Sequence, residues 1–348
     1  METVDNEVLQ ALSARKSVRV YTDEPVTEAE RNAILQAAFQ APTAGNQQLY
    51  TILNITDPAL KASLADLCDH QPFIAKAPLV LVFLADCRRW LQAYKAAGIE
   101  DVRTLGVGDL LLAMADTCIA AQNAVVAAES LGIGSCYIGD VIENAEQMRE
   151  ALHLPEHVVP ACMLVFGRPT EQQKARPKPA RFAKDAVVCE NTYRDRTDDE
   201  LRADFTTRAA ANGQQNYDFT TAIQAFCKRK YESDFSREMT RSAEVYLEEF
   251  RKVFVPQPGF EARYVINIEE KKNPLWIAIG SGALECGYGE TEKPDVEMQM
   301  NRAAMEDIVN GRMTFQRAFM SGIMKRMKGD FRILRTLDQM FPFEENNR

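Results

Sequence analysis

The chain has 348 residues, which at about 150 residues per domain is enough for two domains. Its 41 basic and 50 acidic residues give a net charge of −9, which disfavours a general nucleic-acid-binding protein because such proteins present a basic face. The eight cysteines are scattered without a C-x-x-C pair, so no metal spacing or disulfide framework is visible, and reduced thiols are expected.

The sequence also predicts a soluble, cytoplasmic protein that does not span a membrane. Residues 1–25 are charged and lack the apolar region of a signal peptide. The continuous apolar run at 77–85 is much shorter than the roughly 18 residues that a membrane-spanning helix needs.

Helices and strands alternate through the first half of the chain. A helix is predicted at 6–14, and a capping box from Thr27 to Glu30 opens a second helix, which Pro42 ends. The longest helix is predicted at 107–131 and is apolar around most of its surface, which indicates a buried central helix or a subunit interface. Strands are predicted at 49–54, 77–85, 135–140 and 162–166.

The pattern changes in the second half. Residues 195–215 are polar and compatible with a helix, and a further helix is predicted at 238–254. Alternating apolar residues predict strands at 264–268 and 296–300, with another strand at 275–279. Short helices at about 302–310 and 314–320, and a last helix after Asp330, complete the predicted elements.

The first candidate site is the run Arg15-Lys16-Ser17-Val18-Arg19. Arginine forks and a serine hydroxyl make charge-assisted hydrogen bonds to phosphate, and Arg181 from the later basic loop is a candidate partner. A solvated basic turn is the alternative.

Two further segments have the composition of ligand-binding loops. The loop from Pro42 to Gln48 joins small residues to amide side chains, which lets a ligand approach the backbone. At Tyr137-Ile138-Gly139, backbone amides beside a glycine can lie against a flat heterocycle. By themselves, the first is an ordinary helix–strand loop and the second a tight turn.

Taken together, the segments resemble one known family, the FMN-dependent nitroreductases, in the branch of oxygen-insensitive NADPH nitroreductases and flavin reductases. The resemblance covers about residues 5–250 and rests on RKSVRVYTDEPVTEAE, APTAGNQQ, DHQPFIAKAPLVLVFLAD, AAESLGIGSCYIGD and LPEHVVPACMLVFGRP, in this order. It implies an α+β fold, in which helices wrap a central, mostly antiparallel sheet, and an intertwined homodimer with FMN at the interface.

The resemblance also implies roles for individual residues. The phosphate and ribityl end of FMN would be held by Arg15, Lys16, Ser17 and Arg19, with Lys178 and Arg181 closing on it. Gln71 would contact the isoalloxazine edge, and Tyr137, Ile138 and Gly139 would cover one ring face. The partner chain would line the flavin with Pro42, Thr43, Ala44, Asn46 and Gln48. No catalytic side chain is expected, since the flavin carries the chemistry.

The implied reaction is ping-pong: NADH or NADPH passes a hydride to FMN and leaves, and a nitroaromatic, quinone or flavin acceptor takes its place. Two departures from the family pattern bear on this. Pro179 stands where the family has a lysine, with Lys178 offset by one position. The stretch 209–216 lacks the arginine that NADPH-preferring relatives carry, which leaves the choice of nicotinamide open.

The C-terminal part resembles a different family, the sterol-carrier-protein lipid-binding domain. The resemblance rests on PDVEMQM, IVNGRM, FQRAFMSG and MKGD, and it implies a five-stranded sheet whose helices enclose an apolar tunnel. We therefore expect an FMN-binding domain at 1–240 and a sterol-carrier-like domain at 241–348, which would bind or present a hydrophobic ligand. The alternative is a lipid-binding or scaffolding protein whose flavin site is secondary.

Overall fold

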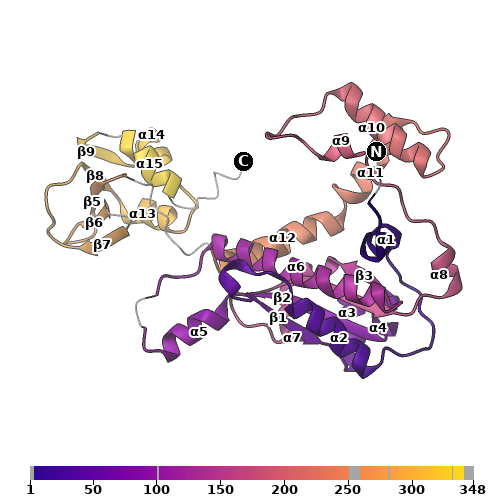
Figure 1. Cartoon of the computed structure of the whole chain (residues 1–348). Helices are drawn as coiled ribbons and strands as arrows, with labels where there is room; N and C mark the ends of the chain where they lie inside the picture. The colour runs from indigo at the N-terminus through magenta and orange to yellow at the C-terminus, as the bar shows by residue number, and fades with distance from the viewer. Residues whose placement is uncertain (1–3, 100–101, 251–258, 281–282, 331, 341–348) are drawn as a thin grey trace. The chain divides into compact units, whose positions relative to one another are not determined.

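The computed structural model describes residues 4–99, 102–250, 259–280, 283–330 and 332–340 (Figure 1). The chain divides into two compact units, Met1–Arg251 and Lys252–Arg348. The boundary predicted from the sequence, 240/241, falls within the helix α12 (Asp234–Glu248). Tyr246 of α12 is buried in a core cluster of the first unit, so the helix packs there. The predicted end of this helix, at 254, lies outside the described residues.

The first unit is built on an antiparallel sheet with the strand order β1-β2-β4-β3. Its strands are β1 (Tyr50–Asn54), β2 (Leu79–Asp86), β3 (Gly134–Ile138) and β4 (Val158–Gly167). All four were predicted, but β4 begins before the expected residue 162. A register shift opposite Phe83 and Leu84 skips Ala161 and puts Pro160 at an irregularity, where a missing N–H is tolerated.

The other regular elements of the first unit are helices (Figure 1). They are α1 (Glu7–Ala14), α2 (Glu28–Phe39), α3 (Pro58–Leu67), α4 (Pro72–Lys76), α5 (Arg88–Ala96), α6 (Val107–Ser130), α7 (Ala145–Leu152), α8 (Glu171–Ala175), α9 (Lys184–Val187), α10 (Asp198–Ala211), α11 (Phe219–Lys230) and α12, with short 3-10 turns η1 (Ala44–Asn46) and η2 (Asp140–Ile142). The predicted capping box at α2 is present: the side chain of Thr27 accepts from Glu30 N, and the carboxylate of Glu30 accepts from Thr27 N.

The helix α6 is the longest element of the unit, as predicted. Ala120, Ala121, Ala124 and Val125 lie in one buried cluster with residues of β2 and β4, so this face of α6 covers the sheet. By length and composition alone α6 is also apolar enough to cross a membrane, a test that the core helix of a soluble protein passes as well.

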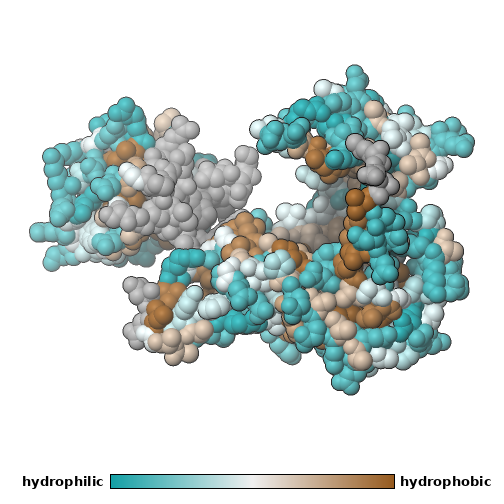
Figure 2. Space-filling model, in the orientation of Figure 1, coloured by the Kyte–Doolittle hydropathy of each residue, from teal (hydrophilic) through white to brown (hydrophobic). Residues whose placement is uncertain are grey.

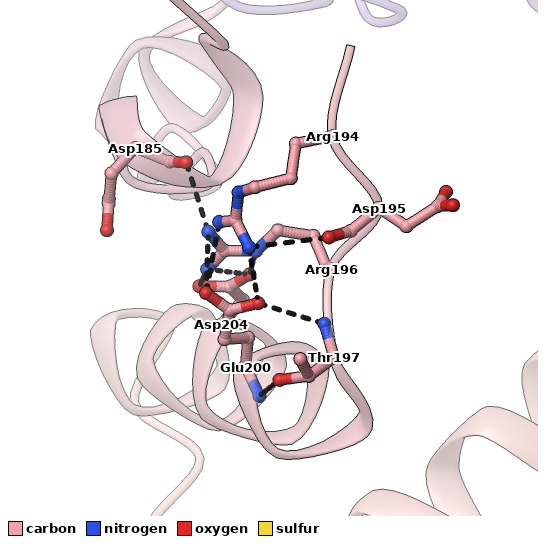
Figure 3. A network of polar contacts seen from close by, with 7 residues as sticks. All are labelled: Asp185, Arg194, Asp195, Arg196, Thr197, Glu200 and Asp204. Atoms are coloured by element: carbon pink, nitrogen blue, oxygen red, sulfur yellow. Dashed lines mark hydrogen bonds and ion pairs between the residues drawn. The ribbon is translucent and has the colours of Figure 1, made fainter.

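The start of α10 is fixed by paired charges (Figure 3). Arg196 makes two hydrogen bonds, of 3.0 and 2.8 Å, to the carboxylate of Asp204 and one of 3.2 Å to the carbonyl oxygen of Asp185. Arg194 bonds both carboxylate oxygens of Glu200, which also accepts from Thr197 N in a capping box. These contacts fold the chain after the basic loop back onto α10.

The second unit has the predicted five-stranded sheet, with the order β7-β6-β5-β8-β9. Its elements are β5 (Ala262–Ile268), β6 (Leu275–Gly280), β7 (Ala283–Tyr288), β8 (Val296–Met300), α13 (Arg302–Val309), α14 (Phe315–Met320), β9 (Lys325–Gly329) and α15 (Arg332–Met340). β5 and β8 are parallel and the other pairs antiparallel. The α+β class expected from the sequence is confirmed.

A core cluster joins this sheet to its helices. Met298 and Met300 of β8 are buried there with Phe315 and Leu337, and the hydroxyl of Tyr264 donates to Ile333 O at 2.9 Å. A separate cavity lies over the sheet edge and is lined mainly by polar and charged residues such as Glu261, Arg263, Glu285, Lys293 and Asp295. The apolar tunnel that the resemblance implies therefore stays a prediction.

Candidate functional site

Two glycines place the cationic run on the sheet. Gly134 of β3 and Gly167 of β4 are register partners. A Cβ atom at Gly134 would lie 2.4 Å from Val18 Cγ2, and one at Gly167 would lie 2.5 Å from Tyr21 Cδ1. The missing side chains thus leave room for residues 17–21, which form bridges from Ser17 to Ser135 and from Tyr21 to Pro169. The run is held against β3 by backbone contacts, whereas a solvated turn would need none.

The structure brings this run together with the basic loop. Both line one cavity of about 220 Å³, formed by Arg15, Lys16, Ser17, Arg19, Arg176, Pro177, Lys178, Pro179 and Arg181. All six predicted phosphate-end residues are in this set. Arg176 belongs to the same wall and was not among the predicted site residues, although it lies in the basic loop that the sequence singled out. We call this set the cationic pocket.

The electrostatics of the cationic pocket favour an anion. Burial, and then the neighbouring Arg181 and Arg15, lower the pKa of Lys178 below its ordinary value. Glu129, at the end of α6, is the carboxylate that faces these cations. Burial raises its pKa, and Arg15, Lys16 and Lys178 oppose that rise. Several cations thus share one partly buried carboxylate, and an additional anion would relieve their repulsion.

The lysines and arginines of the pocket differ in what they contact. Lys178 Nζ donates to the carbonyl oxygens of Leu12 and Ser13, at 3.0 and 2.6 Å, and so satisfies the C-terminal end of α1. Lys16 Nζ donates to the carbonyl oxygens of Lys174 and Arg176. Arg15 Nε, by contrast, is buried without a hydrogen-bond partner among the described residues. Such an orphaned donor is costly unless a ligand satisfies it.

The predicted flavin-edge and flavin-face residues are linked to each other. Gln71 Nε2 donates to Cys68 O at 2.8 Å and to Asp140 Oδ2 at 3.1 Å, and Asp140 directly follows the turn at Gly139. Gly139 is exposed, and a Cβ atom there would meet nothing within 4 Å. The backbone at this turn therefore faces open space.

The same surface continues toward the cationic pocket. The guanidinium of Arg19 lies over the ring of Phe73, 5.7 Å from its centroid, and Phe73 follows Gln71 by two residues. Tyr137 is close enough to Arg15 for the arginine to oppose the burial that raises the tyrosine pKa. These contacts link the cationic pocket to Phe73, two residues from Gln71, and to Tyr137.

The third predicted segment lies elsewhere. Of its members, Pro42, Asn46 and Gln48 are exposed and Thr43 and Ala44 are half-buried. Asp116 of α6 accepts from Ala44 N at 3.0 Å, and Asn46 and Gln48 have positive φ angles of 56° and 52°. Among the described residues of a single chain, this loop does not line the cationic pocket.

The loop instead borders a second cavity, under α5. Trp90 Nε1 donates to Gln47 O at 2.9 Å, and Arg89 donates to the carbonyl oxygens of Gln48 and Tyr50. The cavity has a volume of about 330 Å³ and is lined by Gln47, Leu49, Cys87, Trp90, Leu91, Tyr94, Val102, Arg103, Leu105, Asp109 and Leu112. It combines aromatic walls with one ion pair, between Arg103 and Asp109, at 2.7 Å. We call it the α5 slot.

An antiparallel sheet under helices, with a cationic pocket and an open backbone turn on one surface, defines a domain suited to a phosphate-bearing flat ligand. Residues 12–168 match the nitroreductase family, and residues 258–342 match the SCP-2 sterol transfer family. The chain is 38% identical to an oxygen-insensitive NADPH nitroreductase of Salmonella typhimurium over 58% of its own length and 84% of the relative. It is 32% identical to an FMN reductase [NAD(P)H] of Bacillus subtilis, over 65% of this chain and 93% of the relative.

Solved structures agree with these matches. B. megaterium NfrA2 superposes with a TM-score of 0.60 at 28% identity, covering 70% of this chain and 98% of NfrA2. The NADPH:FMN oxidoreductase from Vibrio harveyi, solved with NAD⁺, gives a TM-score of 0.53 at 27% identity over 64% of this chain and 97% of that one. The chain belongs to the nitroreductase family, and its C-terminal part is an SCP-2-type domain. Both resemblances are confirmed, and the protein is an oxidoreductase of the nitroreductase type.

Proposed function

We propose that the first unit binds FMN and uses it to carry electrons from NADH or NADPH to a flat acceptor. The observation that carries this proposal is the cationic pocket with the orphaned, buried Nε of Arg15. Its donors fit a phosphate: planar forks from Arg15, Arg19 and Arg181 and a hydroxyl from Ser17. Lys16 and Lys178 already donate to carbonyl oxygens. Their positive charges would therefore be held at fixed positions near the phosphate.

The ring system would lie beyond the phosphate, over residues 137–139. Tyr137 and Ile138 would cover one face, the exposed Gly139 would let the ring approach the backbone, and Gln71 would meet the ring edge. When bound, FMN supplies the hydride-transfer chemistry. The residues of the chain position it and exclude water, so no side chain needs to act as an acid or base.

A homodimer would complete this site. The helix α11 has no buried residue in the single chain, and neither has α1, where Val8, Leu9 and Leu12 are exposed. On α6, Leu111 is 64% exposed. Hydrophobic residues show on the face of the first unit that carries α1 and α6 (Figure 2). A second copy would cover these surfaces and bring its Pro42–Gln48 loop to the flavin, in a protein that we place in the cytoplasm.

The α5 slot would receive the acceptor. Because it borders the Pro42–Gln48 loop, it would open toward the flavin that this loop lines in the dimer. Trp90 and Tyr94 offer flat apolar walls for a nitroaromatic, a quinone or a free flavin, and their ring centroids lie 6.0 Å apart. Donor and acceptor would use the stacking position in turn, as a ping-pong sequence requires, with reacting atoms about 3–3.5 Å apart.

The second unit would bind or present a hydrophobic ligand. The SCP-2 match supports this role, and flexible methionines suit a cavity for varied apolar ligands. Met298, Met300 and Met324 are, however, buried in the core of this unit, so they would contact a ligand only if the ligand entered that core. In the alternative, the protein mainly binds lipid or acts as a scaffold, and its flavin site is secondary. The first unit would then be dispensable for the main role of the protein.

Flavin spectroscopy of the purified full-length protein tests the main proposal. We expect a yellow protein whose flavin absorbance bleaches with NADH or NADPH and returns with an added quinone. A colourless protein that takes up no added FMN would overturn it. Removal of residues 252–348 tests whether the second unit presents a hydrophobic substrate to the first unit or only binds a ligand. Presentation of substrate predicts unchanged turnover of water-soluble quinones and loss of turnover for long-chain apolar ones.

A further inference from the structure

The helix α10 holds the part of the basic loop that carries Arg181. Ala180, the residue before Arg181, donates its backbone N–H to the side-chain oxygen of Asn212 at 2.8 Å. Phe182, the residue after it, packs edge-to-face against Phe205 of α10, with ring centroids 4.9 Å apart. Because Asn212 is the C-cap of α10, both neighbours of Arg181 are anchored to this helix.

The amide of Asn212 is fixed in one orientation. Only its oxygen can accept from Ala180 N, since a backbone N–H needs an acceptor. Its nitrogen is then turned toward the helix, where it donates to the carbonyl oxygen of Arg208 at 2.8 Å. The backbone N–H of Asn212 donates to the carbonyl oxygens of Arg208 and Ala209. The side chain thus connects the last turn of α10 to the basic loop.

Arg208 holds the other neighbour of Arg181 through its side chain. Its guanidinium carbon lies over the ring of Phe182, 4.0 Å from the centroid, and is 5.1 Å from the centroid of Phe205. Cation–π contacts at such distances are attractive, and more so where the groups are partly desolvated. Both Arg208 and Phe182 are half-buried. Phe182 therefore contacts two residues of α10, which orders the backbone next to Arg181.

Further contacts fix the basic loop on both sides of this point. Asp185, four residues after Arg181, offers its carbonyl oxygen to Arg196, which also bonds the carboxylate of Asp204 on α10 (Figure 3). Lys178, three residues before Arg181, bonds carbonyl oxygens at the end of α1. The backbone is thus tied to α1 before Arg181 and to α10 after it.

The side chain of Arg181 contributes little to its own placement. It is exposed, and its Nη1 donates to Pro179 O at a long 3.3 Å. An arginine that gives up rotamer freedom on binding loses affinity, and the loss is smaller when its backbone is already in place. Anchoring of Ala180 and Phe182 therefore lowers the cost of bringing this guanidinium to a ligand in the cationic pocket.

We propose that Asn212 and Arg208 are positioning residues for the phosphate of FMN and act through Arg181. Neither residue lines the cationic pocket. This inference rests on the function proposed above and specifies it: α10 fixes the loop backbone so that the Arg181 fork meets the phosphate. The two residues should then matter for FMN and not for riboflavin, which has the same ring and ribityl chain without the phosphate.

A double-mutant cycle on FMN binding to the full-length apoprotein tests this inference. Titration of flavin fluorescence gives the affinities of the wild type, Asn212→Ala, Arg181→Ala and the double variant. Loss of one hydrogen bond predicts that Asn212→Ala lowers FMN affinity roughly 2- to 10-fold. In the Arg181→Ala background the same substitution should change it by less than about twofold, because the guanidinium that it positions is gone. Arg208→Met, which keeps an apolar side chain beside Phe182, should act in the same direction as Asn212→Ala.

Riboflavin and a nearby asparagine provide the controls. The riboflavin affinity of Asn212→Ala should equal that of the wild type, since a positioning role at the phosphate end leaves the ring contacts intact. General damage to the fold would instead lower both affinities. Asn216→Ala, which changes another exposed asparagine, should leave the affinities for FMN and riboflavin unchanged.

Three outcomes would overturn the inference. The first is additive losses of FMN affinity from Asn212→Ala and Arg181→Ala, and the second is an equal loss of FMN and riboflavin affinity. The third is an Asn212→Ala protein that binds FMN as tightly as the wild type. A wild type that binds no FMN would overturn the proposed function and this inference with it, so the wild-type titration distinguishes the two failures.

Discussion

Gln71 donates a hydrogen bond to Asp140 and thereby connects the block predicted to meet the flavin edge with the turn predicted to cover a flavin face. The distance from Gln71 Nε2 to Asp140 Oδ2 is 3.1 Å, and the same nitrogen reaches Cys68 O at 2.8 Å. The amide is thus fixed with its nitrogen toward the protein. Its oxygen is the atom left for a ligand at the ring edge.

The aspartate of this contact also affects a buried acid, Glu143. Its side chain is 5% exposed, and burial, then Asp140, Asp69 and Glu238, raise its pKa from 4.5 to about 7. A raised pKa in the folded state means that folding favours the protonated form. This contribution to stability is complete below about pH 4.5 and is lost as the pH rises through about 7.

Glu143→Gln should therefore stabilise the protein at alkaline pH. We expect a gain of about 1–3 kcal/mol in the free energy of unfolding near pH 8, which disappears toward pH 4. Urea unfolding at several pH values measures it, with Glu156→Gln, an exposed substitution, as the control. A gain that does not depend on pH would contradict the role assigned to ionisation.

Arg19→Ala tests the cationic pocket. Loss of one charge-assisted contact to a phosphate is worth about 1.5–3 kcal/mol, so we expect FMN affinity to fall roughly 10- to 150-fold. Fluorescence titration of the apoprotein with FMN measures this affinity. The fold should persist, because Arg19 is exposed and its side chain contacts mainly the ring of Phe73.

The matched control is Arg312→Ala, an exposed arginine of the second unit that pairs with Asp307 at 2.8 Å. It removes the same charge from a residue that does not line the pocket. If both substitutions weaken FMN equally, the effect is one of net charge and the assignment of Arg19 fails.

Two glycine substitutions distinguish an effect on stability from an effect on FMN binding. Gly139→Val should change the free energy of unfolding by no more than about 0.5 kcal/mol, since φ is −80° and a Cβ atom meets nothing within 4 Å. It should nevertheless abolish FMN binding if the flavin lies against this backbone. Gly134→Ala should cost about 1–3 kcal/mol, because its Cβ would lie 2.4 Å from Val18 Cγ2. Thermal unfolding and FMN titration of both variants measure the two effects. FMN binding that persists in Gly139→Val would show that the flavin ring does not lie against this backbone.

Local patterns in the sequence predicted the strands of the first unit and the helix that Thr27 and Glu30 open, because these depend on neighbours along the chain. The capping box of Thr27 and Glu30 and the apolar run of β2 are such cases. Gly134 and Gly167 show the limit. Their role is to admit Val18 and Tyr21 from a distant segment, which no local pattern indicates.

The same limit applies to the site. Composition marked the basic loop, but which of its residues line the pocket depends on how the loop folds back, and Arg176 was missed for that reason. The helix α11 was not predicted either, because it buries no residue within one chain.

A last prediction concerns Asp338, which holds the second unit together. Its carboxylate oxygens accept from Phe315 N and Gln316 N, each at 2.8 Å, and so satisfy the start of α14. Asp338 is 7% exposed, and Asn would turn one acceptor into a donor facing an N–H. We expect Asp338→Asn to destabilise this unit by about 1–3 kcal/mol.

The two tryptophans allow this to be measured for one unit at a time, since Trp90 lies in the first unit and Trp276 in the second. In a Trp90→Phe background, fluorescence reports Trp276, and the unfolding midpoint should fall with Asp338→Asn. In the chain that retains Trp90, the FMN content should stay unchanged, because the cationic pocket lies wholly within the first unit. Parallel loss of FMN would show that the stability of the second unit supports the flavin site, contrary to this expectation.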